Sequence, residues 1–259
     1  MDEITLTALV LLCVAAAAAG WIDAVVGGGG LILLPAMLIG FPHVPPVYVL
    51  GTNKAVAVAG TSMAAVTYAR KAPLDARLAL RLGGLAMVSA GGGALFASAV
   101  DKEVLNPLIM TVLLAVAAFV AFRPRFGTTP GHGPVTGKRV AAALAVAGGV
   151  IAFYDGLIGP GTGTFLVIAL VALLHMDMVT ASATAKVVNV GTNLGALAVF
   201  TSHGTVLWTV APFLALANLG GGWVGAHMAL KNGNGFVRIV LLTVVTALVA
   251  KLGYDQWGG

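Results

Sequence analysis

Four ionisable residues lie within strongly apolar stretches of this sequence: Asp23, Lys54, Asp155 and Lys186. A charged side chain at the centre of a membrane costs about 2.5–3.5 kcal/mol on insertion scales, and such residues usually mark a transport pathway. Lys54 follows Asp23 at the same spacing at which Lys186 follows Asp155. The lysines could line an anion site, or each could form a buried ion pair with the preceding aspartate that fixes helix packing. The aspartates could be those partners or could take part in proton coupling.

A glycine-rich tract lies between each aspartate and its lysine, at Gly27–Gly30 and at Gly159–Gly163. An unwound tract that opens a helix exposes backbone N–H groups at the positive end of the helix dipole, which suits an anion. In repeat-built transporters such broken helices meet near the membrane midplane. The pieces that follow the tracts, 31–41 and 164–175, are long enough for about half a membrane. The alternative is that the glycines only allow close helix packing.

Hydroxyl and amide side chains near the lysines complete the candidate site. Asn189 and Asn193 follow Lys186 by three and seven residues, so the three share one helix face. Interhelical hydrogen bonding is the alternative role for them. Asp23 and Asp155 are candidates for ion pairing or proton coupling. The candidate substrate-binding residues are Lys54, Lys186, Gly27, Gly28, Gly29, Gly30, Thr52, Asn53, Gly159, Gly161, Thr162, Gly163, Thr164, Asn189 and Asn193.

The composition identifies the elements that must position these residues. The chain has 259 residues, of which 59% are hydrophobic and 9% charged, whereas a soluble domain carries about 25% charge. Continuous apolar runs of helix length, without the alternation of a membrane barrel, predict an all-α polytopic membrane protein. The apolar segments are 4–41, 44–69, 79–100, 104–122, 140–175, 178–201, 205–229 and 236–252. The apolar run at the start of the chain is expected to remain as the first spanning helix rather than to be cleaved as a signal peptide, because the residues before it are acidic and not basic.

The two halves of the sequence resemble each other. One constant shift along the chain superposes Asp23 on Asp155, Gly27 on Gly159 and Lys54 on Lys186 without a gap. Over positions 20–64, 12 of 45 aligned residues are identical, where this composition would give roughly 4 or 5 by chance. We therefore predict two homologous transmembrane repeats, 1–125 and 137–259, joined by a cytoplasmic linker at 126–136.

The positions of lysine and arginine constrain the topology, because cytoplasmic loops retain basic residues. One basic cluster spans 70–81 and another spans 123–139, so both should be cytoplasmic. Five spans per repeat would make the second repeat inverted, whereas re-entrant glycine breaks would give four spans per repeat in parallel. Lys231 and Arg238 lie opposite the acidic loop at Asp101, a side-swapped charge that favours inversion. The prediction is therefore 8 to 10 transmembrane segments with glycine-broken helices.

Other classes of function find little support. Cys13 is the only cysteine, so no internal disulfide can form, and the net charge of +5 belongs to loops and gives no reason to expect nucleic acid. No HExxH metal motif or GxGD context occurs, so no metal, cofactor or enzymatic activity is expected. The expected partners are a small anionic substrate and membrane lipid. An anion-selective channel, and less favoured an intramembrane aspartyl enzyme, are the alternatives.

Four motifs carry a resemblance to a known family. Trp21–Pro35 reads WIDAVVGGGGLILLP, Gly51–Lys54 reads GTNK, Tyr154–Phe165 reads YDGLIGPGTGTF and Thr184–Asn193 reads TAKVVNVGTN. Together these segments resemble the TauE/SafE sulfite-exporter family, and the resemblance extends over essentially the whole chain. It implies a multi-pass secondary transporter of the bacterial or archaeal inner membrane, built by duplication, for sulfite, an organosulfonate or a related sulfur-containing anion.

The resemblance also implies which residues matter. The family's glycine motif falls on Gly27–Gly30 and Gly159–Gly163, and its conserved lysines fall on Lys54 and Lys186. Ala185 stands where the first half has Asn53, so the two halves need not contribute equally. The motifs do not choose the substrate, the direction of transport, the coupling ion or the oligomeric state.

Overall fold

The computed structural model describes residues 5–101, 103–105, 107–109, 111 and 134–257, and every regular element within them is helical. This confirms the predicted all-α polytopic class. The elements are α1 (Leu6–Val26), α2 (Gly30–Gly40), α3 (Pro46–Ala69), α4 (Ala76–Ala99), α6 (Gly137–Ala143), η1 (Leu144–Ile151), α7 (Ala152–Leu157), α8 (Thr162–Leu174), α9 (Met178–Ser202) and α10 (Ala211–Trp257). Gly233 has non-helical backbone angles and kinks α10 there.

Both glycine tracts break a helix, as the sequence predicts. Helix α1 ends where Gly27 adopts a φ of 82°, a left-handed conformation that costs glycine little. In the second half, α7 ends at Leu157 and α8 begins at Thr162, with Gly159 at a φ of 90° between them. Helices α2 and α8 have 11 and 13 residues, or about 16–20 Å, too short to cross a hydrocarbon core of about 30 Å.

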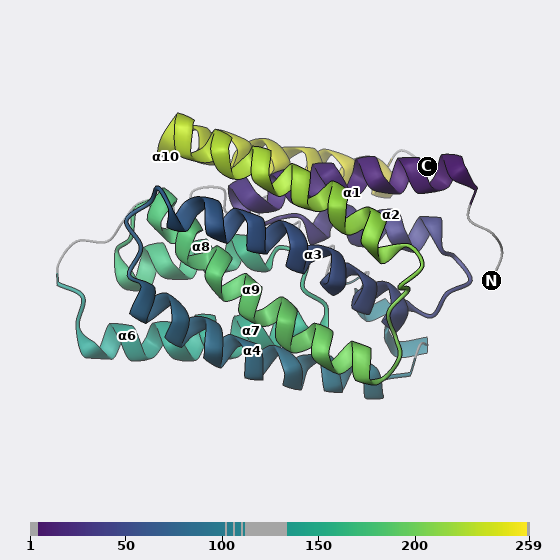
Figure 1. Ribbon diagram of the computed structural model, residues 1–259, viewed down its shortest axis with the longest axis horizontal. Coiled ribbons are helices and arrows are strands. Elements are labelled where there is room, and N and C mark those ends of the chain that lie inside the picture. Colours follow the sequence, from purple (N-terminus) through teal and green to yellow (C-terminus); the bar gives the residue numbers. More distant parts are fainter. Residues whose placement is uncertain (1–4, 102, 106, 110, 112–133, 258–259) are drawn as a thin grey trace.

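The helices pack in three groups, with the most polar pair in the middle (Figure 1). Helices α3 and α9 pack on each other, α10 covers α3, and α4 covers α9. Helix α1 packs on α10 at one side, whereas α7 and η1 pack on α4 at the other. The two lysine-bearing helices are therefore enclosed by apolar helices, which keeps their charges away from lipid.

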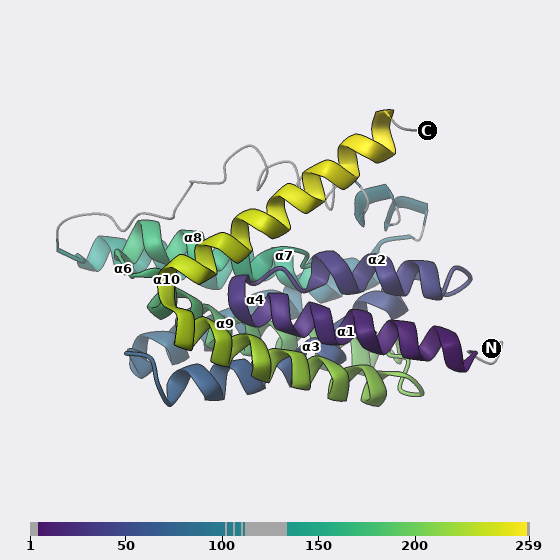
Figure 2. The same cartoon turned by 90° about the horizontal axis from the view of Figure 1, so that it is seen from above.

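Equivalent helices of the two halves run in opposite directions along the long axis. Helix α3 leads away from the end that holds the N terminus, whereas its sequence counterpart α9 leads toward that end (Figure 1). Helix α2 turns back along α1 (Figure 2). The α3–α4 connection, which follows Arg70 and Lys71, and the start of α6, which holds Lys138 and Arg139 of the second basic cluster, lie at the same end of the bundle. These directions are those of an inverted repeat; the duplication and the number of spans stay predictions.

Four of the described helical stretches are long and apolar enough to cross a membrane: Leu6–Val26, Ala76–Ala99, Gly137–Leu157 and Ala211–Gly233. Their outer surfaces expose large apolar side chains, including Leu11 at 65%, Val88 at 73%, Val150 at 69% and Leu216 at 70%. In a membrane these side chains would contact lipid. The predicted segment 104–122 and the predicted linker 126–136 lie mainly outside the described residues.

Candidate functional site

Two buried ion pairs join the halves of the molecule. The Nζ atom of Lys54 donates to Oδ1 of Asp155 at 2.8 Å, and the Nζ atom of Lys186 donates to Oδ2 of Asp23 at 3.0 Å. The side chains of both lysines are 1–2% exposed. The alternative in which each lysine pairs with the aspartate that precedes it in its own half is therefore wrong in its partners, because each pair takes one residue from each half. Ion pairing itself agrees with the structural alternative.

Asp155 is held by several donors. Its Oδ1 atom accepts hydrogen bonds from Lys54 and from the Thr162 hydroxyl at 2.9 Å, and its side chain is 6% exposed. The same hydroxyl also contacts the Gly159 carbonyl at 2.8 Å. A Cβ atom on Gly159 would lie 2.5 Å from Oδ1 of Asp155 and 2.7 Å from Nζ of Lys54. The second glycine tract thus leaves the space that this ion pair occupies.

Asp23 has a more open environment. Its side chain is 20% exposed, and its ionic partner Lys186 also donates to the Asp23 backbone carbonyl. The position equivalent to Thr162 is Gly30, which has no hydroxyl to give. The two repeat-related carboxylates are therefore unequal: Asp155 has two side-chain donors, whereas Asp23 has one among the described residues.

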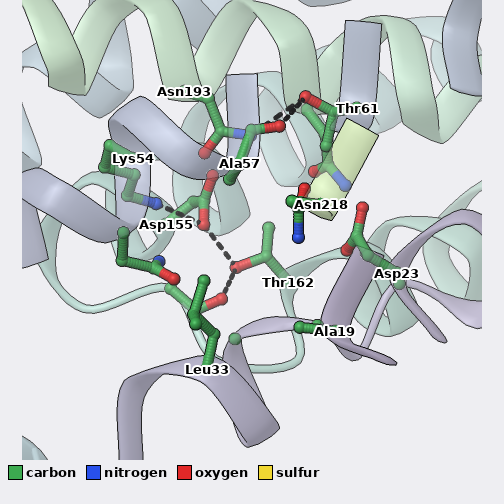
Figure 3. A pocket seen from close by; sticks show the side chains of 17 residues that line it. Ala19, Asp23, Leu33, Lys54, Ala57, Thr61, Asp155, Thr162, Asn193 and Asn218 are labelled. Carbon is green, nitrogen blue, oxygen red and sulfur yellow. Dashed lines mark hydrogen bonds and ion pairs between the residues drawn. The ribbon is translucent and has the colours of Figure 1, made fainter. Parts of the chain in front are cut away.

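A cavity lies between the two ion pairs (Figure 3). Its volume is about 40 Å³, enough for roughly three water molecules or one small anion, since a buried water needs about 10–15 Å³. In Figure 3, Lys54 and Asp155 lie on one side of this space and Asp23 on the other. The lining residues are Ala19, Asp23, Gly27, Gly29, Gly30, Leu33, Asn53, Lys54, Ala57, Thr61, Asp155, Gly159, Thr162, Gly163, Asn189, Asn193 and Asn218.

The two glycine breaks meet beside this cavity. A Cβ atom on Gly27 would lie 2.2 Å from the Gly163 backbone, so the two chains touch without side chains between them. Thr164 fixes the contact, because its N–H donates to the Gly27 carbonyl at 3.3 Å and its hydroxyl donates to the Val26 carbonyl at 2.9 Å. The two broken helices therefore meet at their glycine tracts, as the sequence predicts.

The short helices start at the cavity without side-chain caps. Helix α2 begins after Gly29 and α8 after Gly161, and neither cap residue accepts a hydrogen bond through a side chain. Side-chain caps close the starts of α1, α4, α6 and α9, at Thr5, Asp75, Thr136 and Asp177. The positive ends of α2 and α8 therefore lie at the cavity wall, where Gly29, Gly30 and Gly163 line the space.

Amide side chains dominate the rest of the lining. Asn193 donates to the Thr61 hydroxyl at 3.4 Å, and Asn218 donates to the Ala16 carbonyl at 2.8 Å. The Oδ1 atom of Asn189 is buried and has no hydrogen-bond partner among the described residues. A buried amide oxygen without a partner is costly unless a donor on a water or a ligand satisfies it. Asn189 therefore indicates that the cavity is a place for a guest molecule.

The structure brings most of the predicted site residues to this cavity. Thr52 and Thr164 instead bind neighbouring backbone: Thr52 donates to the Tyr48 carbonyl and accepts from the Leu207 N–H. Lys186 lies behind Asp23. Sequence reasoning missed Asn218, whose equivalent in the first half is Ala86, so the repeat gave no signal for it. The predicted residues that do not line the cavity are Gly28, Thr52, Gly161, Thr164 and Lys186.

The described residues include no cluster of three or more histidine, cysteine, aspartate or glutamate side chains that could hold a metal ion. His43 lies in the connection between α2 and α3, and His175 ends α8. Both histidines are thus near helix ends, and neither lines the cavity.

Known proteins similar to this chain are membrane transporters. The family described as sulfite exporter TauE/SafE matches residues 12–252. The relatives include a protein of a Sinorhizobium species named "Probable membrane transporter protein ORF9", 36% identical over 98% of this chain and 96% of its own. They also include a "Probable membrane transporter protein" of Haemophilus influenzae, 31% identical over 95% of this chain and 94% of its own, and one of Escherichia coli named YfcA, 29% identical over 93% and 87%. No solved structure matches the chain.

Proposed function

Because this chain belongs to the sulfite exporter TauE/SafE family, a family of membrane transporters rather than enzymes, we propose that it moves a small sulfur-containing anion across the bacterial inner membrane. Sulfite and organosulfonates are the proposed substrate class. The proposed binding site is the cavity between the two ion pairs. The protein would act as a secondary transporter that exposes this cavity to each side of the membrane in turn.

One observation carries this proposal: the starts of α2 and α8, the Lys54 side chain and a set of amides all line the same buried space. Helix N-termini, an ammonium group and amide N–H groups are donors that bind oxyanions. The unpartnered Oδ1 atom of Asn189 is a hydrogen-bond acceptor, so it would pair with a water or with a hydrogen carried by the guest rather than with an anionic oxygen. Because both lysines are already paired with aspartates, the amides and helix ends would make most of the direct contacts with the anion.

The inverted course of the helices supports alternating access. In transporters built from inverted repeats, the substrate site lies at the repeat interface, and one bundle rocks against the other. Here both ion pairs and the Gly27–Gly163 contact join one half to the other. In the proposed cycle these contacts would hold the halves together around the cavity while its access changes.

Anion binding can be tested by thermal unfolding of the purified protein in detergent. Sulfite, sulfate, thiosulfate, sulfoacetate, taurine and chloride would be compared at matched ionic strength. A ligand at 100 times its Kd should add about 2.7 kcal/mol, which corresponds to roughly 5–10 °C in Tm. The variant Asn193→Ala should lose this stabilisation, whereas Asn232→Ala, at an exposed asparagine of α10, should keep it. Equal behaviour of the two variants would contradict the proposed site.

A transporter must also be separated from a channel that has the same lining. In proteoliposomes, a transporter should show saturable uptake and counterflow, in which unlabelled anion inside accelerates entry of labelled anion. A channel would conduct without counterflow. Observation of single-channel currents would refute alternating access while leaving the anion site intact.

Cysteine labelling tests the inverted topology. In a Cys13→Ala background, Lys71→Cys lies at the α3–α4 end of the bundle and His203→Cys follows α9 at the other end. A membrane-impermeant maleimide added to intact cells should label only the His203→Cys protein, with Lys71→Cys labelled after permeabilisation. The parallel four-span alternative places both positions on the same side, so identical labelling would overturn the inverted arrangement.

A further inference from the structure

The charges around the cavity balance before any substrate enters. Lys54 and Lys186 contribute two positive charges, and Asp155 and Asp23 contribute two negative charges, in two closed pairs. Binding of an anion would leave this buried set with a net negative charge, which is costly in a low-dielectric interior. An anion site of this composition therefore needs a positive charge that arrives together with the substrate.

A proton satisfies this need with the least space. The cavity of about 40 Å³ holds roughly three waters, so an anion and a separate metal cation would compete for the same volume. A proton that binds to a carboxylate occupies no part of the cavity. Among the described residues, the carboxylates that line the cavity are Asp23 and Asp155.

The surroundings of the two carboxylates differ in a way that selects Asp23. Both lie in the last turn of a helix, where the negative end of the helix dipole disfavours a carboxylate. Asp155 offsets this with charge-assisted hydrogen bonds from Lys54 and Thr162 to one oxygen. Asp23 has Lys186 as its side-chain donor among the described residues, and it is more than three times as exposed, at 20% against 6%.

The groups that face Asp23 come from several helices. Lys186 on α9 contacts it directly. The Tyr68 hydroxyl on α3 donates to the backbone carbonyl of Ala24, the residue after Asp23, at 3.0 Å. Lys54 and Asp155 lie across the cavity. Helix α10 contributes the neutral Asn218 to the lining, and α2 contributes glycines and Leu33. Lys186 is thus the charged group in contact with Asp23, and protonation of Asp23 leaves that charge without its counter-ion.

We propose that Asp23 takes up one proton together with each monovalent anion, so that transport is electroneutral proton–anion cotransport. The carboxylate accepts the proton and becomes a neutral acid. The four-residue set then carries one net positive charge, and the anion in the cavity neutralises it. Release of the anion and of the proton on the other side restores the Asp23–Lys186 pair. This inference rests on the proposed anion site and adds the coupling ion.

The test uses the full-length protein in proteoliposomes that contain a pH-sensitive dye. The probes are radiolabelled methanesulfonate, which stays ionised and carries no proton of its own, and radiolabelled sulfite, with protein-free vesicles as the blank. Wild-type protein should move one proton with each methanesulfonate in the same direction. A membrane potential set with potassium and valinomycin should leave the methanesulfonate rate unchanged, whereas a pH gradient, acidic outside, should drive accumulation.

Matched variants locate the proton. Asp23→Asn imitates the protonated acid, so it should still exchange methanesulfonate in counterflow but lose accumulation driven by a pH gradient. Asp155→Asn is the same substitution at the repeat-related acid and should retain proton movement in any flux that remains. Wild-type binding gives a second measurement that needs no variant: if one proton binds with each anion, the Kd for the transported probe should fall by up to tenfold per unit decrease in pH.

The outcomes separate this inference from the proposed function. Anion flux without proton movement, flux that follows the membrane potential, or dependence on sodium would overturn proton coupling while leaving the anion site standing. Proton movement that persists in Asp23→Asn would assign the proton to another group and refute the role of Asp23. If neither probe is bound or transported, the proposed function fails, and this inference fails with it.

Discussion

The Lys54–Asp155 pair offers the sharpest test of how the two halves are held together. Both side chains are buried, at 2% and 6% exposure, so removal of one partner leaves the other as an uncompensated buried charge. Such a loss costs about 3–5 kcal/mol, and with about 2–4 °C in Tm per kcal/mol for a chain of this size we expect Lys54→Gln or Asp155→Asn alone to lower Tm by roughly 6–20 °C. The double variant Lys54→Gln/Asp155→Asn removes both charges and keeps neutral groups of similar shape. It should therefore recover most of the loss.

Thermal unfolding in detergent of the wild type, both single variants and the double variant forms a complete double-mutant cycle. The expected result is a coupling free energy of about 2 kcal/mol or more, because residues in one ion pair do not contribute independently. The pair Lys54→Gln/Asp23→Asn is the matched control, because these residues belong to different ion pairs and the double variant should be no more stable than either single one. If the losses from Lys54 and Asp155 simply add, the pair does not contribute to stability and the reasoning from burial is wrong.

Two further predictions concern the backbone around the site. The substitution Gly159→Ala should lower Tm markedly, because a Cβ atom there would collide with Asp155 and Lys54 and the positive φ adds about 1–3 kcal/mol of strain; Gly84→Ala, with no atom within 4 Å of the new Cβ, should not lower it, and an equal effect of both would refute the steric argument. Arg139 donates to the carbonyls of Leu173 and Ala172 at the end of α8, so Arg139→Ala should cost about 1 kcal/mol in the same thermal assay. Lys138→Ala, at an exposed neighbour, should cost little; if it matches Arg139→Ala, the effect comes from loss of charge alone.

The sequence predicted the membrane class and the broken helices well, because both depend on local signals. Apolar runs of helix length set the class, and the tracts beginning at Gly27 and Gly159 lie at the observed helix breaks. The candidate site could also be assembled in outline, since an ionisable residue in an apolar segment is conspicuous. These signals need no knowledge of which helix packs on which.

The partners in the ion pairs could not be predicted in the same way. Each lysine could pair with the aspartate of its own half or with the aspartate of the other half. The local sequence does not distinguish these two choices, because the corresponding residues of the two halves are the same. The crossed pairing requires Lys54 on α3 to meet Asp155 on α7 and Lys186 on α9 to meet Asp23 on α1, and these are long-range contacts. Asn218 and the π-helix η1 were missed for related reasons: the first has Ala86 as its repeat equivalent, and the second has no composition that distinguishes it from an α-helix.

The likeness of the halves hides a chemical difference that matters for mechanism. Two positions that correspond in sequence, Thr61 and Asn193, contact each other at the cavity wall. Elsewhere the two halves line the cavity with different residues at corresponding positions: Asn189 corresponds to Ala57, and Thr162 corresponds to Gly30. Each half supplies a helix broken at a glycine tract, and the unequal lining then gives the two aspartates different partners. Among the described residues, Asp155 has a hydroxyl donor beside its lysine and Asp23 does not, and it is this difference that would let the proposed anion and proton bind at distinct places.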